Sequence, residues 1–165
     1  MVNSVSASAV NIPTQVMQQE KILAAIDLGT NSLHMVVVRI RPELPAFSII
    51  AREKDTVRLG DRTSDGNLKP EIVDRAIATL RRFQEIAKSL NADTIIAVAT
   101  SAVRESPNGR EFLQQVQTEI GLSVDLISGQ EEARRIYLGV LSGMELNSHP
   151  HAIIFAKSAA WAAMR

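Results

Sequence analysis

The feature that most constrains the fold is a stretch of apolar residues at helical spacing between residues 70 and 90. Apolar side chains recur there three and four positions apart: Ile72, Val73, Ala76, Ile77, Leu80, Phe83, Ile86, Ala87 and Leu90. This spacing predicts an amphipathic helix that buries one face against another layer of structure. Pro70 suits the first turn of the helix, because the missing N–H has no partner there anyway.

Short runs of apolar and β-branched residues before and after this helix supply the partner layer. They predict strands at residues 22–27, 33–40, 47–53, 94–99 and 124–127. Two further helices are expected, one capped by Ser106 or Asn108 and ended by Gly121, and one that begins at Ser128. The order β-β-β-α-β-α-β-α combines an opening hairpin with strands that alternate with helices. The sequence therefore predicts an α/β fold with a mixed sheet and flanking helices.

The composition excludes several classes of function. Lys plus Arg (18) equals Asp plus Glu (18), and this balance argues against non-specific binding to nucleic acid or to a membrane surface. The chain has no cysteine, so disulfides and thiolate chemistry are excluded. Residues 1–20 lack the basic and apolar regions of a secretory signal and are interpreted as a flexible leader. We expect no nucleic-acid partner, no membrane partner and a cytoplasmic location.

The first candidate site is the polar turn after the first strand. Gly29 lets a ligand approach the backbone closely, and Thr30, Asn31 and Ser32 add side-chain donors. A turn of this kind forms a nest of N–H groups that suits phosphate oxygens. Asp27, at the end of the strand, has the chemistry to hold a hydrated Mg²⁺ beside them. The alternative is an ordinary hairpin turn with local hydrogen bonds.

The second candidate is Arg104, in the segment that follows the strand at 94–99. Residues at the carboxyl ends of parallel strands line the ligand crevice of open α/β sheets. An arginine in that position can bind a phosphate with two parallel hydrogen bonds. The alternative is a surface arginine paired with Glu105 or Glu111.

The third candidate is Glu132, near the start of the last predicted helix. Ser128 and Glu131 have the spacing of a capping box, which gives Glu131 a structural role. Glu132 then remains available to orient a water molecule and to accept its proton. The alternative is a glutamate that only complements the helix dipole. Among the other polar residues, His34 is interpreted as a packed histidine, and Lys54 as either a phosphate contact or part of a solvated strand edge.

Four segments together resemble the exopolyphosphatase/guanosine pentaphosphatase (Ppx/GppA) phosphatases. They are AAIDLGTNSLHMVVV, EKDTVRLG, IIAVATSAVRESPNGREFL and VDLISGQEEARRIYLGV. The segments occur in order over roughly residues 21–141. The resemblance implies the ribonuclease-H-like lobe of the actin-like ATPase superfamily.

The resemblance also implies an activity and roles for the residues above. The family hydrolyses terminal phosphoanhydrides of inorganic polyphosphate, or the 5′ terminal phosphate of guanosine pentaphosphate, with Mg²⁺. The segment 27–32 matches the first phosphate loop, Arg104 the phosphate-binding arginine and Glu132 the base that activates water. By the same resemblance, full-length relatives are expected to form homodimers.

The C-terminal end departs from the family pattern. The family continues with a second phosphate loop, D-x-G-G-G-S-x-E, but residues 155–165 read FAKSAAWAAMR, with neither Asp nor Gly. We therefore expect a truncated lobe over residues 21–154 and an aberrant tail over 155–165, and we hypothesise a frameshift near Ile154. A genuine short protein is the alternative. Three functions stay open: a weak or inactive phosphatase, a kinase or ATPase lobe, and a non-catalytic remnant or binding fragment.

Overall fold

The computed structural model describes residues 20–41 and 47–143 of the protein. Five strands of this part form one sheet in the order β3-β2-β1-β4-β5. They are β1 (Lys21–Leu28), β2 (Leu33–Ile40), β3 (Phe47–Asp55), β4 (Thr94–Ala99) and β5 (Asp125–Leu126). The β1–β2 and β2–β3 pairs are antiparallel, whereas β1–β4 and β4–β5 are parallel. The mixed sheet expected from the sequence is confirmed.

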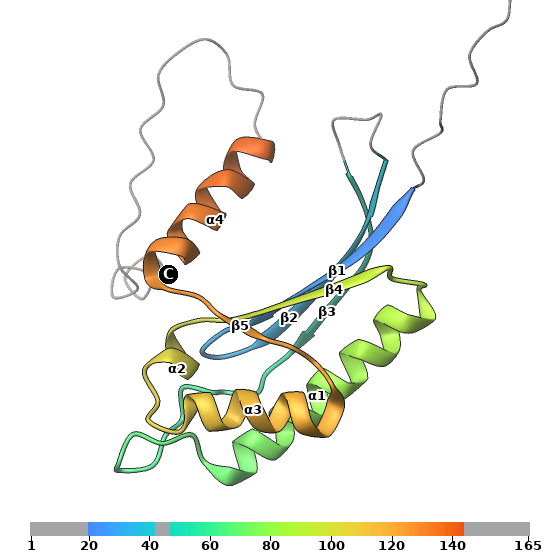
Figure 1. Cartoon of the computed structure of the whole chain (residues 1–165). Coiled ribbons are helices and arrows are strands. Elements are labelled where there is room, and N and C mark those ends of the chain that lie inside the picture. Colours follow the sequence, from blue (N-terminus) through green and yellow to red (C-terminus); the bar gives the residue numbers. More distant parts are fainter. Residues whose placement is uncertain (1–19, 42–46, 144–165) are drawn as a thin grey trace, which may run out of the picture.

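Four helices accompany the sheet in the described part of the chain: α1 (Pro70–Ser89), α2 (Ser101–Arg104), α3 (Gly109–Ile120) and α4 (Gly129–Gly143). Figure 1 shows α1 and α3 against one face of the sheet and α4 on the other side. None of the described helices has both the length and the apolar character needed to cross a bilayer.

The core lies between the sheet and the α1–α3 layer. In β1, Ala24, Ile26 and Leu28 alternate toward this side and are fully or almost fully buried. The apolar face of α1 packs against them, and its Phe83 is completely buried. Burying such a side chain contributes roughly 1.5–3 kcal/mol, so the periodic helix is confirmed as the element that closes the core.

The opposite face of the sheet is only partly covered. Asp27 pairs with His34 and Ala25 pairs with Val36, so these side chains share the uncovered face. Ile96, on the same face, is 43% exposed. The interpretation of His34 as a packed histidine is wrong, because its side chain is exposed on this face. A polar residue is tolerated at this position of the strand because its side chain keeps contact with solvent in the described part of the chain.

The segment between β4 and α3 differs from the prediction. Residues 101–104, for which the sequence predicted no element, form the single helical turn α2. Neither predicted cap works as one: Ser106 Oγ donates to the Ala102 carbonyl at 2.8 Å. Asn108 occupies the N-cap position, but its side chain accepts from the Leu68 N–H at 2.8 Å and donates to the Leu68 carbonyl at 3.1 Å. Gly121 ends α3 as predicted, with φ at 67°.

Two predicted boundaries fall outside the described residues. Residues 1–19 contain nearly all of the predicted leader, and residues 144–165 contain the predicted lobe boundary and tail.

Candidate active site

The three candidate segments follow the carboxyl ends of three neighbouring parallel strands. β1, β4 and β5 lie side by side, and each leads directly into one of the segments. Thr30 Oγ1 and Ser101 Oγ lie 3.3 Å apart, which joins the first segment to the second. Arg104 Nη1 donates to the Ile127 carbonyl at 2.8 Å, which joins the second to the third. These two contacts join residues that are 71 and 23 positions apart in the sequence.

The turn after β1 has a backbone suited to an anion. The Gly29 N–H donates to the Ser32 carbonyl at 3.2 Å, and a Cβ on Gly29 would lie 2.9 Å from that oxygen, so the turn requires glycine. Within the described residues, the N–H groups of Thr30, Asn31 and Ser32 donate to no protein acceptor. Successive unpaired N–H groups form a concave anion-binding surface.

The carbonyl groups of the same turn are held by segment 58–60, which the sequence indicated only as part of the family resemblance and not as a support of the turn. The Arg58 N–H donates to the Asn31 carbonyl at 2.9 Å, and the Gly60 N–H donates to the Thr30 carbonyl at 2.8 Å. Arg58 has φ at 63°, a left-handed conformation that is costly for a residue other than glycine. A Cβ on Gly60 would lie 2.6 Å from Thr30 Cγ2. In the sequence, the apolar residues Val57 and Leu59 followed by Gly60 could have indicated that this segment packs against the core, and both side chains are buried in the structure.

Arg104 and Glu132 face each other at the ends of β4 and β5. Arg104 Nη1 lies 3.7 Å from Glu132 Oε2, and the two side chains are 30% and 35% exposed. An ion pair with this much solvent contact contributes little to folding stability, so both charges stay available to a ligand. In the described residues Arg104 pairs with neither Glu105 nor Glu111, so that alternative is wrong.

The start of α4 separates the roles of its two glutamates. Ser128 Oγ accepts from the Glu131 N–H at 3.1 Å, as the capping box predicts. The Glu131 carboxylate does not complete the box; it accepts from Arg135 Nε at 2.8 Å instead. This hydrogen bond holds the pKa of Glu131 below its usual range. Glu131 is therefore engaged along its own helix, whereas Glu132 faces Arg104.

Asp27 stands at the edge of a cavity on the uncovered face of the sheet. Partial burial raises the pKa of the Asp27 carboxyl above its usual range, since the neighbouring protein displaces water from the charged form. His34 acts in the opposite direction, and the negative charge of Glu132 raises the pKa further. The carboxyl keeps exposed surface, so the loss of hydration is incomplete.

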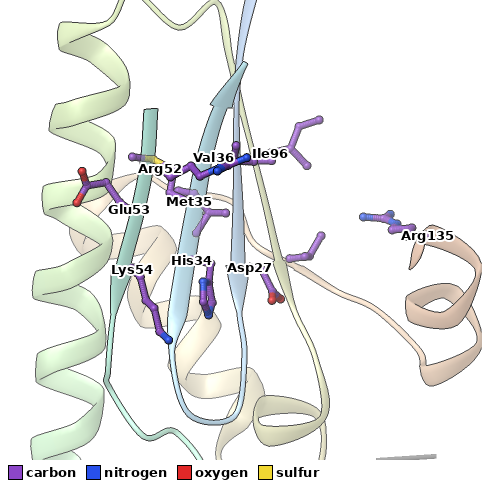
Figure 2. A pocket seen from close by; sticks show the side chains of 12 residues that line it. Asp27, His34, Met35, Val36, Arg52, Glu53, Lys54, Ile96 and Arg135 are labelled. Atoms are coloured by element: carbon purple, nitrogen blue, oxygen red, sulfur yellow. The ribbon is translucent and has the colours of Figure 1, made fainter. Parts of the chain in front are cut away.

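The cavity itself has a volume of about 550 Å³. Apolar side chains of three strands line part of it: Ala25, Val36, Ile96 and Val98. Figure 2 shows Asp27, His34 and Lys54 at one end of the cavity and Arg135 of α4 on its far side. Because cross-strand pairing sets His34 between Asp27 and Lys54, the charged residues form a row across β1, β2 and β3.

These residues fit a magnesium ion that is held together with a phosphate ligand. Mg²⁺ commonly takes one or two protein carboxylates and fills its other positions with water and phosphate oxygens. Asp27 supplies such a carboxylate, and a cation beside it would relieve its repulsion with Glu132. No group of three or more acidic or histidine side chains forms a metal site within residues 20–41 and 47–143. With Asp27 as the protein carboxylate, the site therefore suits a magnesium ion that binds together with the phosphate.

Comparison with known proteins gives consistent matches. A model of the Ppx/GppA phosphatase family matches residues 36–154. The crystal structure of the Aquifex aeolicus member of that family is similar at 28% identity and a TM-score of 0.73, over 78% of this chain and 42% of that chain. An exopolyphosphatase from Cytophaga hutchinsonii is similar at 31% identity and a TM-score of 0.68, over 73% of this chain and 38% of that chain. This chain spans less than half the length of either relative.

Proposed function

We propose that this chain, which belongs to the Ppx/GppA phosphatase family, contributes half of a polyphosphate-hydrolysing site. It has the ribonuclease-H-like, actin-like ATPase fold of that family. The observation that carries the proposal is the convergence of the phosphate-loop candidate, Arg104 and Glu132 at one edge of the sheet. The substrate proposed is inorganic polyphosphate, and the proposed location is the cytoplasm. Because this chain covers less than half of each matched relative, we expect weak turnover from this chain alone.

We assign the residues complementary roles around the terminal phosphate. The free N–H groups of Thr30, Asn31 and Ser32 bind its oxygens, and Arg104, at the end of the neighbouring strand β4, adds a charged donor. Donors of this kind stabilise the negative charge that spreads over the phosphoryl oxygens during transfer. Their positions are set by backbone hydrogen bonds, so little reorganisation is needed when the phosphate binds.

Glu132 is proposed as the general base. A water molecule attacks the terminal phosphorus, the bond to the bridging oxygen breaks, and orthophosphate leaves with a polyphosphate one unit shorter. Glu132 accepts the proton of the attacking water, and Arg104 keeps the carboxylate oriented at 3.7 Å. A bound Mg²⁺, held by Asp27 and phosphate oxygens, would supply neutralisation of substrate charge.

The test compares two neighbouring glutamates on the same helix. Phosphate release from polyphosphate with Mg²⁺ is measured for the chain alone and for the chain joined to the remaining part of the Aquifex aeolicus relative. Glu132→Gln should lower turnover about 100-fold or more, within the range of general-base catalysis, with substrate binding kept. Glu131→Gln is the matched control and should stay within about threefold of the parent, since Glu131 is engaged with Arg135.

The outcome of that comparison separates the open functions. Turnover that survives Glu132→Gln would refute the assignment of the base. Phosphate binding without turnover in both forms would favour a non-catalytic binding fragment. Phosphate transfer to an acceptor other than water would favour a kinase-type lobe.

One observation favours guanosine pentaphosphate as a second candidate substrate. The apolar part of the cavity, formed by Ala25, Val36, Ile96 and Val98, offers a surface on which a purine ring can lie. Inorganic polyphosphate has no apolar group to use it. Ile96→Ser should then weaken binding of guanosine pentaphosphate and leave polyphosphate binding unchanged; an equal effect on both substrates would remove this candidate.

A further inference from the structure

We propose that Arg62 is a positioning residue of this site, which holds α2 so that Ser101 and Arg104 face the phosphate loop. Arg62 lies in the loop between β3 and α1. The proposal rests on the function proposed above for the identity of the anion. Its geometric part stands on contacts within this chain.

The Arg62 side chain reaches from its own loop to α2. Nη2 donates to the Ala102 carbonyl at 3.1 Å and lies 3.7 Å from Glu105 Oε2. The side chain is only 25% exposed, and its Nε is buried with no hydrogen-bond partner among the described residues. A buried donor without a partner is costly, and a solvent-facing rotamer would avoid that cost. The contacts with α2 must therefore outweigh it.

A single helical turn needs such support. α2 has four residues, and a helix this short is not stable by itself because nucleation costs more than one turn returns. Within the described residues, the Ser101 and Val103 carbonyl groups accept backbone N–H groups, but the Ala102 carbonyl accepts none. The Ala102 carbonyl receives two donors, Arg62 Nη2 and Ser106 Oγ, which occupy both of its lone pairs. Arg62 thus anchors the middle of α2 from outside the local sequence.

The same loop also holds the phosphate-loop candidate. Two residues before Arg62, the Gly60 N–H donates to the Thr30 carbonyl at 2.8 Å. Segment 58–62 therefore contacts the turn after β1 with its backbone and α2 with its arginine. This double contact keeps Thr30 Oγ1 at 3.3 Å from Ser101 Oγ. Loss of the Arg62 contact should let α2, and Arg104 with it, move relative to the turn.

The experiment uses Arg62→Gln, Arg62→Lys and a matched control, Arg110→Gln. Arg110 is exposed on α3, and its side chain makes no hydrogen bond or ion pair within the described residues. Amide hydrogen exchange of Arg104 and Glu105 is measured without ligand, and tripolyphosphate affinity is measured by calorimetry. Arg62→Gln should speed exchange and weaken affinity, each by about 3–10-fold, the size expected for one lost hydrogen bond.

The other variants decide between positioning and a general charge effect. Arg62→Lys should recover part of both losses, because its ammonium can still donate to the Ala102 carbonyl, and Arg110→Gln should change neither. Unchanged exchange in Arg62→Gln, or an equal loss of affinity in Arg110→Gln, would overturn the proposal. A chain that fails to bind tripolyphosphate counts against the proposed function. Amide hydrogen exchange is measured without ligand, so it decides the role of Arg62 in that case as well.

Discussion

Replacing Gly109 with alanine should destabilise the protein, although glycine to alanine in a helix usually stabilises. Gly109 is the first residue of α3 and is buried. An added Cβ would lie 2.0 Å from the Val103 carbonyl oxygen and 3.0 Å from the Val103 carbonyl carbon. An ordinary contact between carbon and oxygen is about 3.3 Å or more, so the two backbone segments must separate by roughly 1 Å.

The magnitude follows from two opposing effects. Forcing extra volume into a packed site costs about 1–3 kcal/mol, whereas helix propensity returns at most about 1 kcal/mol near a helix end. We expect a net loss of about 2 kcal/mol in the free energy of unfolding. At roughly 4 °C per kcal/mol for a domain of this size, the melting temperature should fall by about 8 °C.

The assay is thermal and urea unfolding followed by circular dichroism, with Gly121 as the control position. Gly121 has φ at 67° and nothing within 4 Å of an added Cβ, so only its backbone conformation resists substitution. Gly121→Asn should therefore be milder than Gly121→Ala, since asparagine tolerates the left-handed region. Gly109→Asn should be no milder than Gly109→Ala. A Gly109→Ala protein as stable as the parent would refute the packing argument.

Two further outcomes are expected from the residues of the site. Asp27→Asn should raise the melting temperature at pH 7. Folding raises the pKa of the Asp27 carboxyl, so the parent protein loses stability as the pH rises from the usual carboxyl range through that raised pKa. Asparagine carries no charge and avoids this loss. The difference between the two proteins should vanish at a pH below the usual carboxyl range, and an equal difference at both pH values would contradict it. Ser128→Ala should cost about 1 kcal/mol of helix stability, because Ser128 Oγ accepts the Glu131 N–H at 3.1 Å. Faster amide exchange confined to the first turn of α4 would support this, and unchanged exchange at Glu131 would count against it.

Most of the architecture was readable from local patterns. The spacing of apolar residues placed α1 within one residue of its observed end, and the β-branched runs placed β2 and β4 at their observed bounds. Gly121 and Ser128 marked the end of α3 and the start of α4 by their own backbone chemistry. These features depend on neighbours within a few positions, and such neighbours are visible in the chain.

The arrangement of the site depended on contacts that the chain order does not display. The sequence indicated Asp27, Arg104 and Glu132 as site residues, but the acids it offered as partners for Arg104, as the alternative to phosphate, were Glu105 and Glu111. In the structure Arg104 contacts Ile127 and Glu132, which follow the next strand along the chain.

Asn108 and Arg62 show the same limit more strongly. The side chain of each forms a hydrogen bond with a backbone group 40 residues away, Asn108 with Leu68 and Arg62 with Ala102. A polar side chain takes whichever donor or acceptor the packed fold brings within about 3 Å, and that neighbour exists only after the sheet and helices have assembled. Local pattern thus determined the elements of this protein, and tertiary packing decided which polar groups meet at the edge of its sheet.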